Sequence, residues 1–190
     1  MREACAMKIE PLHDDFGARV RGVDLTGPLP LEQVEALHAA IDEHSILLFP
    51  EQDMSDEAQL SLTQALGDLE ENHVAFGRTG EIVHIGTVGN VIDAHTKRDE
   101  SDPHTQALKG NNLWHSDSSF RLVPSYVSIL HAYETPTEGG ETEFVSQRAA
   151  YERLSLAQRT EIDDLHVLHD YVFSRTKTAP VDDKHAASLP

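Results

Sequence analysis

Apolar and polar positions follow one another in short blocks, and the spacing within each block predicts an element. Residues 9–25 alternate apolar positions with turn residues, including Gly17 and Gly22, and predict short strands. After Pro30, side chains recur at helical spacing and predict a helix that ends near residues 44–45, with a face formed by Val34, Leu37, His38 and Ile41. Residues 46–49 are continuously apolar and predict a buried strand that stops at Pro50.

Serine caps mark two further helices. Ser55 precedes Asp56 and Glu57, which favour the first turn of a helix. The apolar face of this helix would comprise Ala58, Leu62, Ala65, Leu66 and Leu69, with Gly67 weakening its last turn. Ser155-Leu156-Ala157-Gln158 matches a capping box, and residues 149–154 predict a helical turn before it.

The middle of the chain predicts strands around a long polar stretch. Residues 81–88 and 125–134 are expected to be strands, and the turn at Gly139-Gly140 is expected to feed another short strand. Residues 89–113 are polar and predict an active-site loop that leads into the segment after it. Short strands framing a few helices indicate a mixed α+β fold, with a β-sandwich or jelly-roll core.

Composition limits the partners of the protein. The 190 residues carry 33 acidic and 15 basic side chains, a formal net charge of −18 at pH 7. This charge opposes binding to nucleic-acid phosphates and to anionic membrane surfaces, so neither partner is expected. The single cysteine, Cys5, cannot form an intrachain disulfide, and the first residues lack the apolar region of a signal peptide. These features predict a cytoplasmic protein.

The clearest chemical signal lies in residues 111–120, where His115 and Asp117 stand two positions apart. In an extended segment such residues point to the same side. A neutral imidazole and one carboxylate are two of the three ligands in a facial-triad site for non-haem iron(II). This spacing therefore indicates an oxygen-activating enzyme.

The His-x-Asp spacing has low specificity when taken alone. With 12 histidines in the chain, about one such pair is expected by chance, and His13-Asp14-Asp15 is a second one, interpreted as a solvated turn. Context favours His115, because Trp114 can shield a metal from water and a strand-like run follows. Two alternatives stay open: His115 and Asp117 only hydrogen-bond each other or the backbone, or they serve a zinc hydrolase, which also needs three protein ligands.

Three segments carry a resemblance to a known family. They are residues 46–53 with the helix ending at 65–70, residues 113–121, and residues 136–144 continuing through 148–151. In order and spacing they resemble the taurine/2,4-dichlorophenoxyacetate dioxygenase family of iron(II)- and 2-oxoglutarate-dependent enzymes, over about residue 9 to the last residue. The sequence of residues 114–121, Trp-His-Ser-Asp-Ser-Ser-Phe-Arg, is most similar to the aryloxyalkanoate branch of this family.

The resemblance implies a double-stranded β-helix (jelly roll) with flanking helices, and the cofactors Fe(II), 2-oxoglutarate and O2. It implies that His115 and Asp117 bind the iron and that Thr142 hydrogen-bonds a 2-oxoglutarate carboxylate. It also implies that Asn111 and His73 contact the substrate. That substrate would be a small organic anion, an aryloxyalkanoate first and an alkylsulfonate such as taurine, or a sulfate ester, second. Lys97, Arg98 and Lys109 are expected either to attract this anion or to be solvated, and a homo-oligomer is expected.

The family's third iron ligand, a histidine, and the arginine that pairs with 2-oxoglutarate have no identifiable match. His166, His169 and His185 are poor candidates for the ligand, and Arg148 and Arg175 are poor candidates for the clamp. We expect residues 1–190 to form a single jelly-roll domain, the N-terminal two-thirds of the family domain, incomplete at its C-terminus and with its active-site loop at about 89–113. The alternative function is that of a truncated, non-catalytic homologue serving as a binding or structural module.

Overall fold

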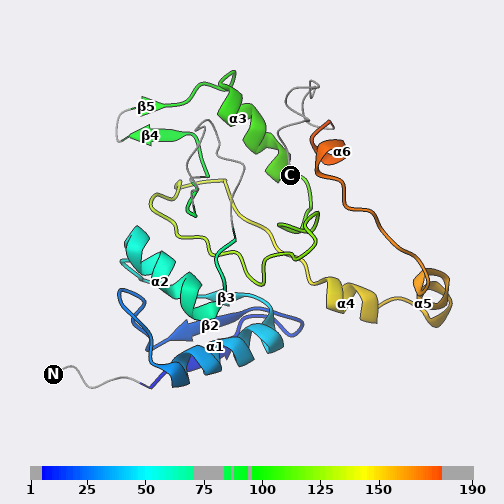
Figure 1. Ribbon diagram of the computed structural model, residues 1–190, viewed down its shortest axis with the longest axis horizontal. Helices are drawn as coiled ribbons and strands as arrows, with labels where there is room; N and C mark the ends of the chain where they lie inside the picture. Colours follow the sequence, from blue (N-terminus) through cyan, green and yellow to red (C-terminus); the bar gives the residue numbers. More distant parts are fainter. Residues whose placement is uncertain (1–5, 71–83, 87, 94–95, 177–190) are drawn as a thin grey trace. The chain divides into compact units, whose positions relative to one another are not determined.

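The computed structural model describes residues 6–70, 84–86, 88–93 and 96–176 (Figure 1). These residues belong to two compact units, the first formed by 1–68 with 129–166 and the second by 69–128 with 167–190. In chain order the elements are β1 (Lys8–Pro11), β2 (Ala18–Arg21), α1 (Leu31–His44), β3 (Leu47–Leu48), α2 (Asp56–Leu66), β4 (Val91–Asp93), β5 (Thr96–Lys97), α3 (Pro103–Leu108), η1 (Lys109–Asn112), α4 (Gln147–Glu152), α5 (Leu156–Ile162) and α6 (Tyr171–Thr176).

The first unit contains a three-stranded sheet beside α1 and α2 (Figure 1). β1 and β2 are antiparallel with Ile9 opposite Val20, and β2 runs parallel to β3 with Ala18 opposite Leu47. The short strands predicted for residues 9–25 are therefore confirmed. The strand predicted at 46–49 shortens to two residues and is not buried, because Leu48 is 46% exposed.

The core of the described residues lies in this first unit. Its side chains come from β2, the residues after β2, α1, α2 and α4, and Leu37 and Val20 are its largest fully buried members. In α1, Val34 and Leu37 of the predicted face are buried, whereas His38 and Ile41 are half-buried and Ala40, which was not predicted, is buried as well. Burial of such a stripe, rather than helix propensity, supplies most of the stability of a helix.

The predicted caps are confirmed. The Ser55 hydroxyl accepts a hydrogen bond from the Ala58 amide over 3.2 Å, and α2 ends at Gly67. Ser155 and Gln158 form the expected capping box at the start of α5. Each cap satisfies backbone groups that the first turn leaves without a partner inside the helix.

The second unit holds β4, β5, α3 and η1 between residues 91 and 112, drawn in green in Figure 1. The segment predicted to be an active-site loop, residues 89–113, therefore contains short strands and helices. β4 and β5 pair antiparallel with an irregular register between Val91 and Asp93, so backbone hydrogen bonds join these two strands. Among the described residues, no helix is long and apolar enough to cross a membrane.

Three strand predictions fail in the described residues. Within residues 125–134, positions 125–132 show the alternating exposure of a strand, yet the segment pairs with no described strand. Residues 141–145 after the Gly139-Gly140 turn are exposed and irregular. Of the strand predicted at 81–88, residues 81–83 and 87 lie outside the described residues and the rest form no strand. A period of two indicates which way side chains face, but a strand forms only where a neighbouring strand supplies hydrogen bonds.

Candidate metal centre

His115 and Asp117 lie side by side in the second unit. The Nε2 atom of His115 is 3.3 Å from Oδ1 of Asp117, and the two side chains are 47% and 59% exposed. The other carboxylate oxygen, Oδ2, accepts a hydrogen bond from the Ser128 hydroxyl over 2.8 Å. Each oxygen of Asp117 therefore has a defined direction, and Oδ1 is the one that faces the imidazole.

A backbone contact determines the tautomer of His115. Its Nδ1 atom lies 2.7 Å from the carbonyl oxygen of Leu113. A carbonyl can only accept, so Nδ1 carries a proton, and in the neutral tautomer with this proton Nε2 presents a lone pair. Two acceptors, Nε2 and Oδ1, then face each other, an arrangement that is stabilised only by a cation or a proton between them.

The pair has the donor types and spacing that a divalent first-row metal requires. Two donor atoms at right angles in an octahedral site, each about 2.1 Å from the metal, lie about 3 Å apart. The observed 3.3 Å between Nε2 and Oδ1 is close to that separation. The Nδ1–H bond to a backbone carbonyl is the usual orienting contact of a metal-ligating histidine. The residues present therefore fit a metal such as Fe(II).

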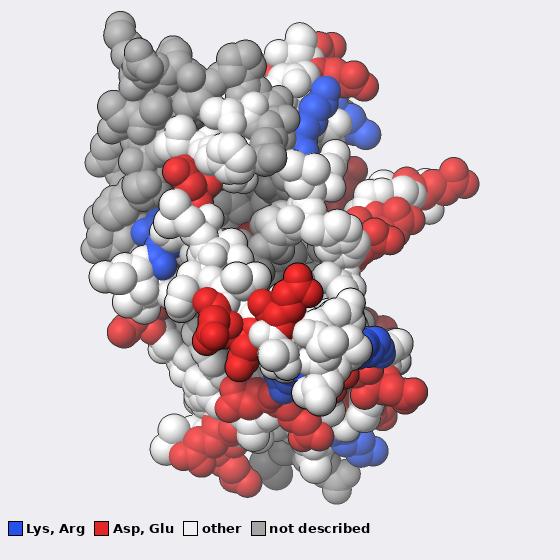
Figure 2. All heavy atoms as spheres, turned by 90° about the vertical axis from the view of Figure 1, so that its right-hand side faces the viewer, with Lys and Arg blue, Asp and Glu red and all other residues white. Residues whose placement is uncertain are grey.

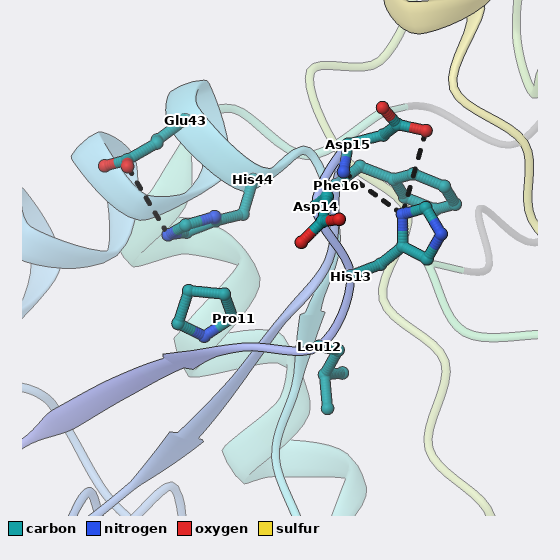
Figure 3. A pocket seen from close by; sticks show the side chains of 8 residues that line it. All are labelled: Pro11, Leu12, His13, Asp14, Asp15, Phe16, Glu43 and His44. Carbon is teal, nitrogen blue, oxygen red and sulfur yellow. Dashed lines mark hydrogen bonds and ion pairs between the residues drawn. The ribbon is translucent and has the colours of Figure 1, made fainter.

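The second His-x-Asp pair, at His13 and Asp15, differs in its contacts: Nδ1 of His13, not Nε2, lies 3.7 Å from Oδ2 of Asp15 (Figure 3). There Nδ1 of His13 accepts a hydrogen bond from the Asp15 amide over 3.1 Å, which occupies its lone pair. The Asp15 carboxylate forms an ion pair with Arg153, and this hydrogen-bonded guanidinium holds the pKa of Asp15 below its ordinary value. His13 is thus the solvated turn that the sequence predicts, although it borders an open pocket of about 440 Å³ in the first unit.

The other predicted site residues lie in different parts of the chain. Asn111 is in η1, immediately before the segment that holds the pair. Thr142 is exposed in the first unit, after the Gly139-Gly140 turn. His73 lies outside the described residues. Trp114 is 68% exposed, so the expected shielding of the metal by its ring is not found.

A third ligand is absent from the described part of the chain. Among those residues, no group of three or more His, Cys, Asp or Glu side chains could hold a metal ion. His166 and His169 are exposed, and His185 lies outside the described residues. Arg148 donates hydrogen bonds to the Asp42 carbonyl and the Ser45 hydroxyl, so it holds the end of α1.

Sequence reasoning missed two residues that support the pair. Ser128 is a polar position inside the apolar run 126–130, and this break in the pattern was the available signal. Glu70 accepts hydrogen bonds from the hydroxyls of Ser118 and Ser125 and pairs with Arg121. No local pattern links Glu70 to residues 48 and 55 positions away.

Acidic side chains outnumber basic ones in the chain, 33 to 15. Figure 2 shows acidic side chains spread over the displayed face with basic ones scattered among them. Of the three basic residues in the 89–113 segment, Arg98 pairs with Asp102 at 3.5 Å, whereas Lys97 and Lys109 are exposed. The two lysines are thus the basic groups of this segment that remain available to an anion.

Comparison with known proteins places these residues in a wider group. The model of the family described as "Taurine catabolism dioxygenase TauD, TfdA family" matches residues 8–189. The chain is 32% identical over 185 residues to the (S)-phenoxypropionate/alpha-ketoglutarate-dioxygenase of Delftia acidovorans, covering 96% of this chain and 61% of that protein. It is 30% identical to the alpha-ketoglutarate-dependent 2,4-dichlorophenoxyacetate dioxygenase of Cupriavidus pinatubonensis, covering 87% of this chain and 58% of that protein.

A solved structure agrees with these sequence relationships. The crystal structure of AAD-2 in complex with Mn(II) and N-oxalylglycine superposes with a TM-score of 0.82 at 30% identity. The match covers 96% of this chain and 63% of that one. The chain thus spans about six-tenths of the length of the relatives it matches.

Proposed function

The chain belongs to the TauD/TfdA family of taurine catabolism dioxygenases, and on this basis we propose that it is an iron(II)- and 2-oxoglutarate-dependent dioxygenase of small organic anions. The observation that carries the proposal is the Nε2–Oδ1 pair of His115 and Asp117, held 3.3 Å apart while Nδ1 of His115 contacts the Leu113 carbonyl. In the proposed enzyme these two side chains hold the iron. We propose that its core is a jelly roll, and the similarity to the AAD-2 structure supports this fold.

Bound iron with 2-oxoglutarate and O2 supplies the oxidation: 2-oxoglutarate loses CO2 and becomes succinate, and one oxygen atom enters a substrate C–H bond. The chain's own residues bind and orient. The Leu113 carbonyl keeps the proton on Nδ1 of His115, and the Ser128 hydroxyl keeps Oδ2 of Asp117 turned away from the imidazole. Thr142 donates to a carboxylate of 2-oxoglutarate, while Asn111 and His73 contact the substrate.

The proposed substrate class is the aryloxyalkanoates, with alkylsulfonates and sulfate esters second. The relatives named above are dioxygenases of 2,4-dichlorophenoxyacetate and (S)-phenoxypropionate, and a further one, from Pseudomonas putida, is a sulfate ester dioxygenase. Hydroxylation of the carbon beside an ether oxygen gives a hemiacetal, which breaks its C–O bond to release a phenol and a carbonyl acid. The exposed Lys97 and Lys109 attract the substrate carboxylate towards an otherwise acidic protein.

The test is succinate formation by the purified protein with Fe(II), ascorbate, 2-oxoglutarate and an aryloxyalkanoate. Wild-type protein should release succinate in proportion to the phenol formed, and His115→Ala should abolish both. His13→Ala is the matched control, because it removes the histidine of the other His-x-Asp pair, and it should keep full activity. Succinate release that survives His115→Ala would overturn the proposal, and a wild type without turnover would favour a non-catalytic binding module.

A further inference from the structure

We propose that Glu70 is a positioning residue for the metal centre, holding the turn that follows Asp117 through Ser118, Ser125 and Arg121. The inference rests on the proposed function, because it concerns how tightly His115 and Asp117 hold their metal. It assigns a role to a carboxylate that neither touches the metal pair nor lies near it in the sequence.

The turn itself is strained and needs an anchor. Ser118, the residue after Asp117, has a φ of +54°, a conformation that costs a residue other than glycine about 1 kcal/mol or more. A backbone hydrogen bond from the Arg121 amide to the Ser118 carbonyl closes the turn over 2.9 Å. Such a conformation persists only where the surroundings fix it, and here it determines the direction in which the chain leaves Asp117.

Glu70 supplies that fixation from outside the turn. One carboxylate oxygen, Oε2, accepts hydrogen bonds from the hydroxyls of Ser118, over 2.6 Å, and Ser125. The other oxygen, Oε1, lies 2.6 Å from Nε of Arg121, and the two charged side chains are only 30% and 19% exposed. The Ser125 hydroxyl also lies 3.1 Å from that of Ser118. One carboxylate thus joins both ends of the segment 118–125.

This clamp and the metal pair share one short piece of chain. Ser118 is adjacent to Asp117, and Ser128, the hydroxyl that orients Oδ2 of Asp117, stands three residues after Ser125. Loss of the clamp would therefore release Asp117 from both sides, while the Nδ1 contact of His115 with Leu113 would remain. The expected effect is a weaker metal site with intact imidazole chemistry.

The experiment measures metal affinity rather than turnover. Co(II) is titrated anaerobically into the whole chain and binding is followed by its visible absorption bands, in wild type, Glu70→Gln, Glu70→Ala and the control Glu161→Gln, which changes an exposed carboxylate on α5. Glu70→Ala should weaken Co(II) binding by about tenfold or more. Glu70→Gln, which keeps the acceptor oxygen but loses the charge, should recover part of that affinity, and Glu161→Gln should match wild type.

The outcomes separate a positioning role from a merely structural one. A folded Glu70→Ala protein with wild-type Co(II) affinity and spectrum overturns the proposal, even if its melting temperature falls. If Glu70→Ala does not fold, Ser118→Gly decides, because glycine adopts the positive φ without strain but lacks the hydroxyl; severalfold weaker binding supports the proposal and unchanged binding overturns it. If the proposed function itself is wrong, His115→Ala should bind Co(II) as tightly as wild type, and this result is distinct from an unchanged affinity in Glu70→Ala alone.

Discussion

The hydrogen bond from Ser128 to Asp117 provides a direct test of how the metal centre is held. Ser128→Ala removes one donor, 2.8 Å from Oδ2, and touches nothing else in the pair. Changes in the outer shell of a metal site typically cost 10- to 100-fold in affinity. The Asp117 side chain is 59% exposed, so water replaces part of the lost bond. We therefore expect the lower end, about a tenfold weaker metal affinity, or about 1.4 kcal/mol.

The assay is an anaerobic titration with Mn(II), in which the electron paramagnetic resonance signal reports the free ion. Ser128→Thr is the matched control, because it keeps the hydroxyl, and it should bind within about twofold of wild type. The free energy of unfolding should change by less than about 0.5 kcal/mol in either variant, because the bond is exposed. Wild-type Mn(II) affinity in Ser128→Ala would refute the idea that this hydroxyl orients the carboxylate.

Three further predictions concern the first unit. Leu37 is 0% exposed and Leu156 is 81% exposed. Leu37→Ala should therefore lower the free energy of unfolding by about 2–5 kcal/mol, and Leu156→Ala should lower it by less than about 0.5 kcal/mol. Equal losses in urea titrations would contradict the location of the core. Arg153 lowers the pKa of Asp15, so the pair stabilises the fold above the ordinary carboxyl pKa and this contribution is lost as pH falls through the lowered value. Asp15→Asn should make the free energy of unfolding less dependent on pH in this acidic range. An unchanged pH dependence would rule out the ion pair as its source. Ser155→Ala removes the hydroxyl that accepts from the Gln158 amide, while the backbone amide of residue 155 still donates to Oε1 of Gln158. It should destabilise α5 by about 1 kcal/mol, seen as faster amide exchange confined to that helix; unaltered exchange would show that this hydroxyl is dispensable.

The metal centre divides into a part that the sequence specifies and a part that it leaves open. A separation of two residues brings His115 and Asp117 together in an extended segment, and their donor atoms do lie 3.3 Å apart. The same spacing at His13 and Asp15 gives a looser pair, with Nδ1 of His13 3.7 Å from Oδ2 of Asp15, because a backbone amide occupies the imidazole and Arg153 pairs with the carboxylate. Only the folded chain reveals this difference, since the Arg153 contact spans 138 positions of sequence.

The sequence by itself determined the helices of the first unit, because their signals are local. Ser55 and Ser155 accept hydrogen bonds from amides three residues further on, and the α1 stripe repeats within one helix. Strand formation depended on tertiary structure. Residues 125–132 have the alternation of a strand but no described partner, whereas β4 and β5, in a mainly polar stretch, pair with each other. The physical reason is the separation in sequence between hydrogen-bonding partners. A helix satisfies its backbone groups within four residues. A strand ladder requires chain segments that only folding brings together, and so does a carboxylate such as Glu70 that joins distant hydroxyls.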